Sequence, residues 1–161
     1  MNTLLIAEHN NATLADATVK SVTAAAQMGG DLHVLVAGAN CASVGEAAAK
    51  LDGVAKVLVA DDALYEKQLA EPMAALVTSM ADGYATIATP ASTNGKNFMP
   101  RIAALLDCSQ ISDITAVVDG QTFERPIYAG NAIQTVRTSE ARKAITIRST
   151  AFAAAGDGGR A

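Results

Sequence analysis

Two periodicities alternate along the first two thirds of the chain. Short, uninterrupted apolar runs predict buried strands, and the segments between them carry apolar residues every three or four positions, which predicts amphipathic helices. The expected strands cover residues 3–8, 32–37, 56–60, 84–88 and 111–118, and the expected helices cover residues 14–28, 43–52, 72–82 and 97–106. Regular alternation of strands and helices with short links predicts a parallel sheet covered by helices on both faces.

The beginnings of three helices carry capping signals. Ser43 and Glu46 have the spacing of a capping box, in which each side chain satisfies a free amide of the first turn. Asn10 or Asn11 is the expected cap of the first helix, and Asn97 that of the fourth.

The pattern changes after residue 120. Residues 121–125, 127–128, 132–137 and 143–148 look like strands with no helix between them, so we expect antiparallel pairing. Residues 151–161 are small and Gly-rich and read as a linker. The predicted organisation is one α/β domain over residues 1–150, a doubly wound, mostly parallel, Rossmann-like sheet with an antiparallel β extension at residues 121–149.

Composition narrows the classes of protein. With 161 residues the chain has the size of one domain, and its charged fraction of 17% lies below the ~25% of an average domain, so we expect a partner to cover part of the surface. A net charge of −4 without a basic run argues against a nucleic-acid binder. No apolar stretch reaches the ~20 residues of a membrane span, and the strand pattern at residues 3–8 leads us to expect no targeting sequence. A soluble cytoplasmic protein of bacterial type is expected.

Side chains that could carry chemistry are few. Cys41 and Cys108 are far apart and form no CxxC, so we expect free thiols and no metal site. His9 ends a strand beside Glu8, but neighbours along a strand point to opposite faces, which favours a structural or partner-contacting histidine over a general base. His33 lies within a strand and is expected to be satisfied locally. No catalytic residue is predicted.

One loop could hold an anion. If the strand order is 3-2-1-4-5, the switch point lies between the first and fourth strands, and ligands of such sheets bind there. The loop after the fourth strand supplies two hydroxyls, an amide, a glycine and a lysine next to free helix amides. These residues are Ser92, Thr93, Asn94, Gly95 and Lys96. Pro90 and Asn97 depart from a phosphate-binding P-loop, so a capped loop with a solvated lysine is favoured.

The sequence resembles one known family. Residues 123–132 read Phe-Glu-Arg-Pro-Ile-Tyr-Ala-Gly-Asn-Ala and are followed by Thr135-Val136, a stretch similar to that of electron transfer flavoprotein alpha subunits. Matching segments occur in the same order at residues 5–9, 69–72, 95–97, 100–107, 110–114 and 148–152. The resemblance covers nearly the whole chain.

The resemblance implies an adenine nucleotide alpha hydrolase-like fold and a role in electron transport. Such proteins are heterodimers with a beta subunit that carries AMP, and they pass electrons from dehydrogenases, such as the acyl-CoA dehydrogenases of fatty acid beta-oxidation, to a membrane quinone oxidoreductase. Most of their FAD site lies in a C-terminal domain, expected to follow residue 161. The expectation is therefore an N-terminal scaffold domain, not an enzyme, with no cofactor residues of its own.

The residue types also suggest a partner interface in residues 125–137. Arg125, Tyr128, Asn131 and Arg137 are the candidates, because Pro126 removes a ladder donor and residues 130–131 permit a positive φ at a bend. A sheet extension within the domain explains the stretch equally well. Two other functions stay open: an adenine-nucleotide-binding module or hydrolase that uses the loops after the first and fourth strands, and a self-associating interaction protein.

Overall fold

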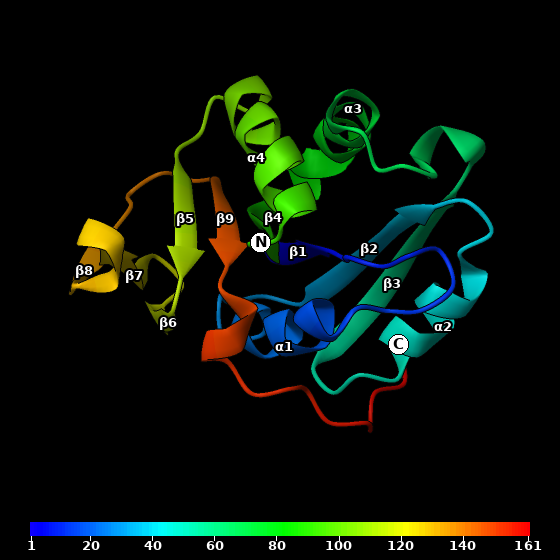
Figure 1. The fold of residues 1–161 in the computed structure, drawn as a ribbon, viewed down its shortest axis with the longest axis horizontal. Helices are drawn as coiled ribbons and strands as arrows, with labels where there is room; N and C mark the ends of the chain where they lie inside the picture. Colours follow the sequence, from blue (N-terminus) through cyan, green and yellow to red (C-terminus); the bar gives the residue numbers. More distant parts are fainter.

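Six parallel strands form the central layer of the protein, whose computed structural model describes residues 1–161 (Figure 1). They are β1 (Asn2–Ile6), β2 (Leu32–Gly38), β3 (Val54–Asp61), β4 (Tyr84–Pro90), β5 (Gln110–Ile114) and β9 (Lys143–Ile147). Their order is β3-β2-β1-β4-β9-β5. The order 3-2-1-4-5, on which the expected switch point depends, is present, with β9 inserted between β4 and β5.

Helices cover both faces of this sheet, as Figure 1 shows. Helices α1 (Asp16–Ala25) and α2 (Ala42–Ala49) pack on one face, and α3 (Ala70–Met80) and α4 (Thr93–Leu105) on the other. The doubly wound α/β prediction is therefore confirmed. No helix combines the length and the apolar character that spanning a bilayer requires.

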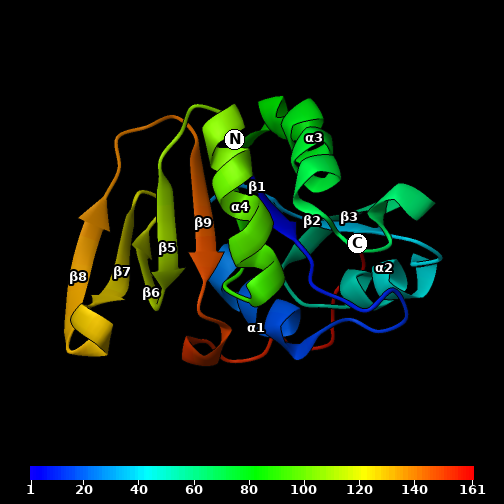
Figure 2. The same cartoon turned by 45° about the horizontal axis from the view of Figure 1, so that its top comes forward.

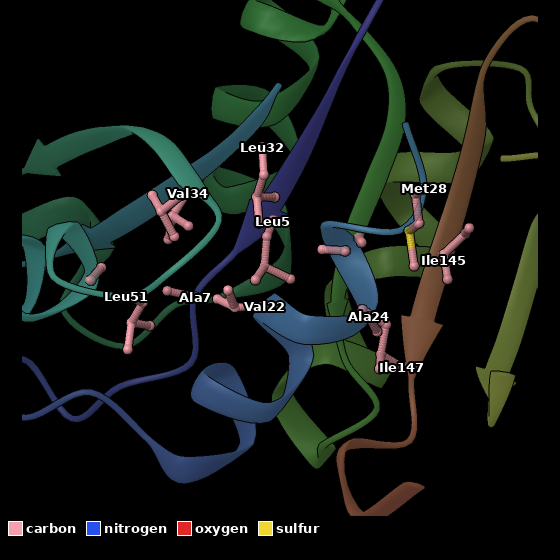
Figure 3. Packing of buried hydrophobic residues seen from close by; sticks show 14 of the residues in the cluster. Leu5, Ala7, Val22, Ala24, Met28, Leu32, Val34, Leu51, Ile145 and Ile147 are labelled. Atoms are coloured by element: carbon pink, nitrogen blue, oxygen red, sulfur yellow. The ribbon is translucent and has the colours of Figure 1, made fainter. Parts of the chain in front are cut away.

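The apolar runs of the strands feed two separate cores because successive side chains point to opposite faces. Leu5 of β1 belongs to the core under α1 and α2, whereas Leu4 belongs to the core under α3 and α4. In the first core, small side chains such as Ala24 of α1 let the helix lie close to Ile147 of β9 (Figure 3). With aromatic residues at only 4%, aliphatic side chains fill both interiors.

A second, antiparallel sheet contains β6 (Ala116–Asp119), β7 (Thr122–Ile127) and β8 (Ala132–Arg137). This three-stranded meander lies beside β5 at one end of the molecule (Figures 1 and 2). The expected strand at residues 111–118 is in fact two strands, β5 and β6, in different sheets. Phe123 of β7 is fully buried against the first core and anchors the meander there.

The antiparallel pairing expected for residues 143–148 is wrong. β9 pairs in parallel with both β4 and β5, with Ile145 opposite Ala88 on one side and Ile111 on the other. Parallel neighbours need a long crossover connection, which is usually a helix. Here the meander is that crossover, so the absence of a helix before residue 143 did not indicate antiparallel pairing.

The predicted helix caps are also wrong. Ser92 caps α4 by accepting a hydrogen bond from the Gly95 amide at 3.1 Å, so the helix begins before Asn97. Neither α1 nor α2 has a side-chain cap. Ser43 donates instead to the carbonyl of Ala12 at 3.2 Å, and Asn10 closes a tight turn by accepting from the Ala12 amide at 3.0 Å.

Short 3₁₀ turns complete the chain at η1 (Ala63–Tyr65), η2 (Ala81–Gly83), η3 (Tyr128–Gly130) and η4 (Ser149–Ala151). The turn expected in the loop after β3 corresponds to η1. After η4 the chain runs along α1 and finishes beside α2 (Figure 1). The domain limits at residues 150 and 151 stay a prediction.

The central position of β9 predicts how its side chains contribute to stability. Replacing the fully buried Ile145 by alanine should lower the free energy of unfolding by about 2–5 kcal/mol, because the lost methyl groups leave a cavity. Urea unfolding followed by circular dichroism measures the change. The matched control is Ile133→Ala on β8, whose side chain is 57% exposed and whose loss should cost less than about 0.5 kcal/mol. Equal costs would contradict the burial of β9.

Candidate functional site

The carboxyl ends of β1 and β4 form the switch point of the sheet, because the chain runs from β1 towards β2 on one side and from β4 towards β5 on the other. The loop that follows β1 folds over the end of β2. A Cβ added to Gly38, the last residue of β2, would lie 2.2 Å from the Asn11 side-chain oxygen and 2.7 Å from the His9 ring. A side chain at this position would therefore displace both His9 and Asn11 from the end of β2.

His9 holds this loop in place. Its Nδ1 accepts a hydrogen bond from the Asn11 amide at 3.0 Å, which places the ring proton on Nε2, where it donates to the Ala37 carbonyl at 3.0 Å. The side-chain Nε2 of the buried Gln68 donates to the same carbonyl at 3.0 Å. Burial lowers the pKa of His9, and the bond to Ala37 opposes that shift only in part. His9 thus holds the loop after β1 against the end of β2, and whether it also contacts a partner stays a prediction.

Asn11 and Asp61 extend this network. Asn11 accepts from the Ala39 amide at 3.0 Å and donates to the Glu66 carbonyl at 3.1 Å. The Asp61 carboxylate accepts from the amides that open α2, those of Asn40 at 2.7 Å and Cys41 at 3.1 Å. The protein's own side chains and amides thus pair with one another on the β1–β2 side of the switch point.

The loop after β4 is built differently. Ser92 caps α4, and Gly95 lies so close to β4 that an added Cβ would approach the Pro90 carbonyl oxygen to 2.1 Å. Thr93, Asn94 and Lys96 are exposed. The favoured interpretation, a capped loop with a solvated lysine, agrees with this geometry.

Beside this loop lies an open pocket of about 350 Å3 at the ends of β4, β9 and β5. Its lining consists of Ala91, Lys96, Asp113, Arg148, Ser149 and Thr150. Arg148 forms an ion pair with Asp113 through Nη2 and a second bond through Nε at 3.1 Å, and this pairing raises the pKa of Arg148. Asp113 thus neutralises one of the two cations of the pocket.

Asp113 itself is held in an unusual conformation. Its φ is +60°, and its amide donates to the Thr146 hydroxyl of β9 at 2.8 Å, where the pairing of β5 with β9 shifts register. The sequence offers no signal for this ion pair, because Asp113 in β5 and Arg148 directly after β9 meet only once β9 is inserted.

The four predicted interface residues do not form one cluster. Arg125 donates from Nε to the Ser112 carbonyl at 2.7 Å and ties the meander to β5. Tyr128 is 78% exposed at the β7–β8 tip, and Asn131 is exposed there too. Arg137 is exposed at the other end of β8, ~20 Å along an extended strand. The positive φ predicted at residues 130–131 occurs at Gly130 but not at Asn131; Tyr128 and Ala129 adopt it instead.

The remaining candidates are structural. His33 pairs with the Tyr84 hydroxyl at 2.8 Å, as a locally satisfied histidine should. Cys41 and Cys108 are free thiols, and burial raises the pKa of each. No group of three or more His, Cys, Asp or Glu side chains could hold a metal ion.

Comparison with known proteins agrees on one family. A model of the electron transfer flavoprotein domain matches residues 3–161. The electron transfer flavoprotein subunit alpha of Pseudomonas aeruginosa is 59% identical over 100% of this chain and 52% of its own length. Those of Paracoccus denitrificans and Bradyrhizobium diazoefficiens are 55% and 60% identical, again over 100% of this chain but 52% and 51% of their own lengths. The chain spans about half the length of the curated relatives it matches.

The environment of His9 predicts a pH-dependent stability. Because its pKa is lower in the folded than in the unfolded chain, the unfolded state binds more protons at mildly acidic pH. The free energy of unfolding should be highest above the ordinary histidine pKa of about 6.5. It should fall as the pH drops from there through the pKa of His9 in the folded chain. Urea unfolding between pH 7.5 and 5 measures this decline, which should flatten in His9→Gln. An unchanged slope in that variant would contradict the assignment.

Proposed function

Because the chain belongs to the electron transfer flavoprotein family, we propose that it is the N-terminal scaffold domain of an alpha subunit. One observation carries this proposal: alpha subunits match the chain along its full length but extend to about twice that length. The rigid two-core sheet suits a platform on which other parts of a complex assemble.

In this proposal FAD is held by polypeptide outside these residues. A ring system of the size of a flavin binds in a concave and mostly apolar site. The largest pocket here measures about 370 Å3, is open, and has only Ile111 and Val136 as apolar members of its six-residue lining. The pocket at Lys96 has a single apolar lining residue, Ala91. The residues of this chain therefore do not fit a flavin.

The parent protein, on this view, is an alpha–beta heterodimer that carries electrons from dehydrogenases such as acyl-CoA dehydrogenases to a quinone oxidoreductase, in the cytoplasm of a bacterium. The present chain contributes structure and contacts and has no catalytic site. It acts as part of an electron carrier rather than as an enzyme.

The meander is the contact surface that we propose for the beta subunit. Tyr128 combines an apolar ring with a polar tip, a type of side chain that is enriched in interfaces. Its exposure of 78% places it where a partner can bury it, and Asn131 lies beside it. Arg137 provides a charged group at the opposite end of β8, and Arg125 contributes by fixing the meander to β5.

Replacing Tyr128 by serine should therefore weaken binding of the purified beta subunit by at least about tenfold in Kd, the loss expected for an aromatic residue at the centre of an interface. Isothermal titration calorimetry measures this change. Leu64→Ser is the matched control, since Leu64 is a 61% exposed apolar residue on η1, beyond the opposite edge of the sheet. Equal affinity of the wild type and both variants would contradict the proposed surface.

The alternative function, an adenine-nucleotide-binding module or hydrolase, needs a ligand over the loops after β1 and β4. The first loop lies against Gly38 and is tied down by His9 and Asn11. The second loop has one unpaired cation, Lys96, beside the ion pair of Arg148 with Asp113. The packed loop after β1 argues against a bound nucleotide. The loop after β4 offers only the charge of Lys96 to a phosphate.

We accordingly expect no heat of binding when AMP or ATP is titrated into the chain at millimolar concentration. Calorimetry with both nucleotides is the measurement. A saturable heat that disappears in Lys96→Ala would instead establish a nucleotide site at the loop after β4.

A further inference from the structure

The last residues of the chain are hydrogen-bonded to the body of the domain. The amides of Gly158 and Gly159 donate to the Lys50 carbonyl at 3.0 and 2.9 Å, and that of Ala161 donates to Ala49 at 3.2 Å. In the other direction, the Asp52 amide donates to the Gly156 carbonyl at 2.8 Å. These contacts run past the C-terminal end of α2 and continue a contact of the Ala155 amide with the Val19 carbonyl of α1 at 3.1 Å.

The accepting carbonyls are those that a helix leaves without partners. The last four carbonyls of an α-helix have no amide within the helix to pair with. At the end of α2 the carbonyl of Ala49 and that of its capping residue Lys50 receive their hydrogen bonds from the tail. The tail therefore caps the C-terminal end of α2.

The tail glycines are in close contact with the body. A Cβ added to Gly159 would lie 2.2 Å from the backbone oxygen of Leu51 and 2.9 Å from that of Ala49. One added to Gly158 would meet only the side chain of Asp52, at 2.3 Å. At Gly159 the obstacle is thus fixed backbone, whereas at Gly158 it is the end of a side chain that can rotate away.

From these contacts we propose that residues 155–161 form a strap that closes the C-terminal end of α2, and that Gly159 is present for close approach rather than for flexibility. The strap also covers apolar surface, since Ala155 and the preceding Phe152 pack against the core under α1 and α2. Release of the strap would leave the helix carbonyls unpaired and would expose that edge of the core. The strap is a conformational device of this chain and does not depend on the proposed function.

Amide hydrogen exchange of the full 161-residue chain, resolved by NMR, tests the strap. The amides of Asp52, Gly158 and Gly159 should exchange at least ~10-fold more slowly than in an unstructured peptide, because each is bonded in the closed strap. In Gly159→Ala the amides of Asp52 and Gly158 should lose this protection. The amide of Ile145 in β9 should stay protected, which would show that the fold is intact.

Gly158→Ala is the matched control, because it is the same substitution one residue earlier. Rotation of Asp52 should accommodate the new methyl group, so protection in the strap should stay within about threefold of the wild type. Two results would overturn the proposal: unprotected amides in the wild type, or identical behaviour of the two alanine variants. The latter is what a free tether would give, since both substitutions stiffen a disordered chain equally.

Discussion

The insertion of β9 between β4 and β5 is the interaction on which the rest of the structure depends. All five residues of β9 are buried, and its side chains enter both cores, Ile145 under α1 and Ala144 under α4. An unpaired strand in that position would leave two rows of peptide groups without partners, at a cost of about 1–3 kcal/mol for each buried group. The insertion also fixes both ends of the meander, since the chain must leave β5 and return one strand further in.

The two sides of the switch point differ because of this insertion. On the side of β1 and β2, polar groups pair within the protein, and His9 and Asn11 lie against the backbone of Gly38. On the side of β4, β9 and β5, the inserted strand β9 places Arg148 beside Asp113. These two residues and Lys96 line an open pocket. A fold that often binds ligands across this whole crevice is here internally paired on one half, which suits a scaffold better than a nucleotide-binding module.

Much of the fold could be predicted because its signals are local. The adjacent residues Leu4 and Leu5 serve opposite cores, and runs of this kind identify buried strands. The partners of β9 could not be predicted, because an apolar run carries no information on which strands it will join. Ser92 and Asn97 are equally good caps by residue type, and only packing decides between them. The side-chain contacts of the candidate site could not be predicted from the sequence. Nothing near Gln68 or Asp113 indicates that their partners, Ala37 and Arg148, come from distant parts of the chain.

The backbone at the β7–β8 tip is strained at two residues that are not glycine. Tyr128 and Ala129 adopt φ values of 49° and 53°, a left-handed conformation that costs a non-glycine residue on the order of 1–2 kcal/mol. Such conformations persist when surrounding contacts over-determine them. Gly159 meets its constraint by lacking a side chain, whereas Tyr128 keeps a large ring 78% exposed. Within this chain little burial offsets the strain at Tyr128. A partner that buries the ring would supply the compensation, which supports the meander, with Tyr128 at its tip, as the proposed interface.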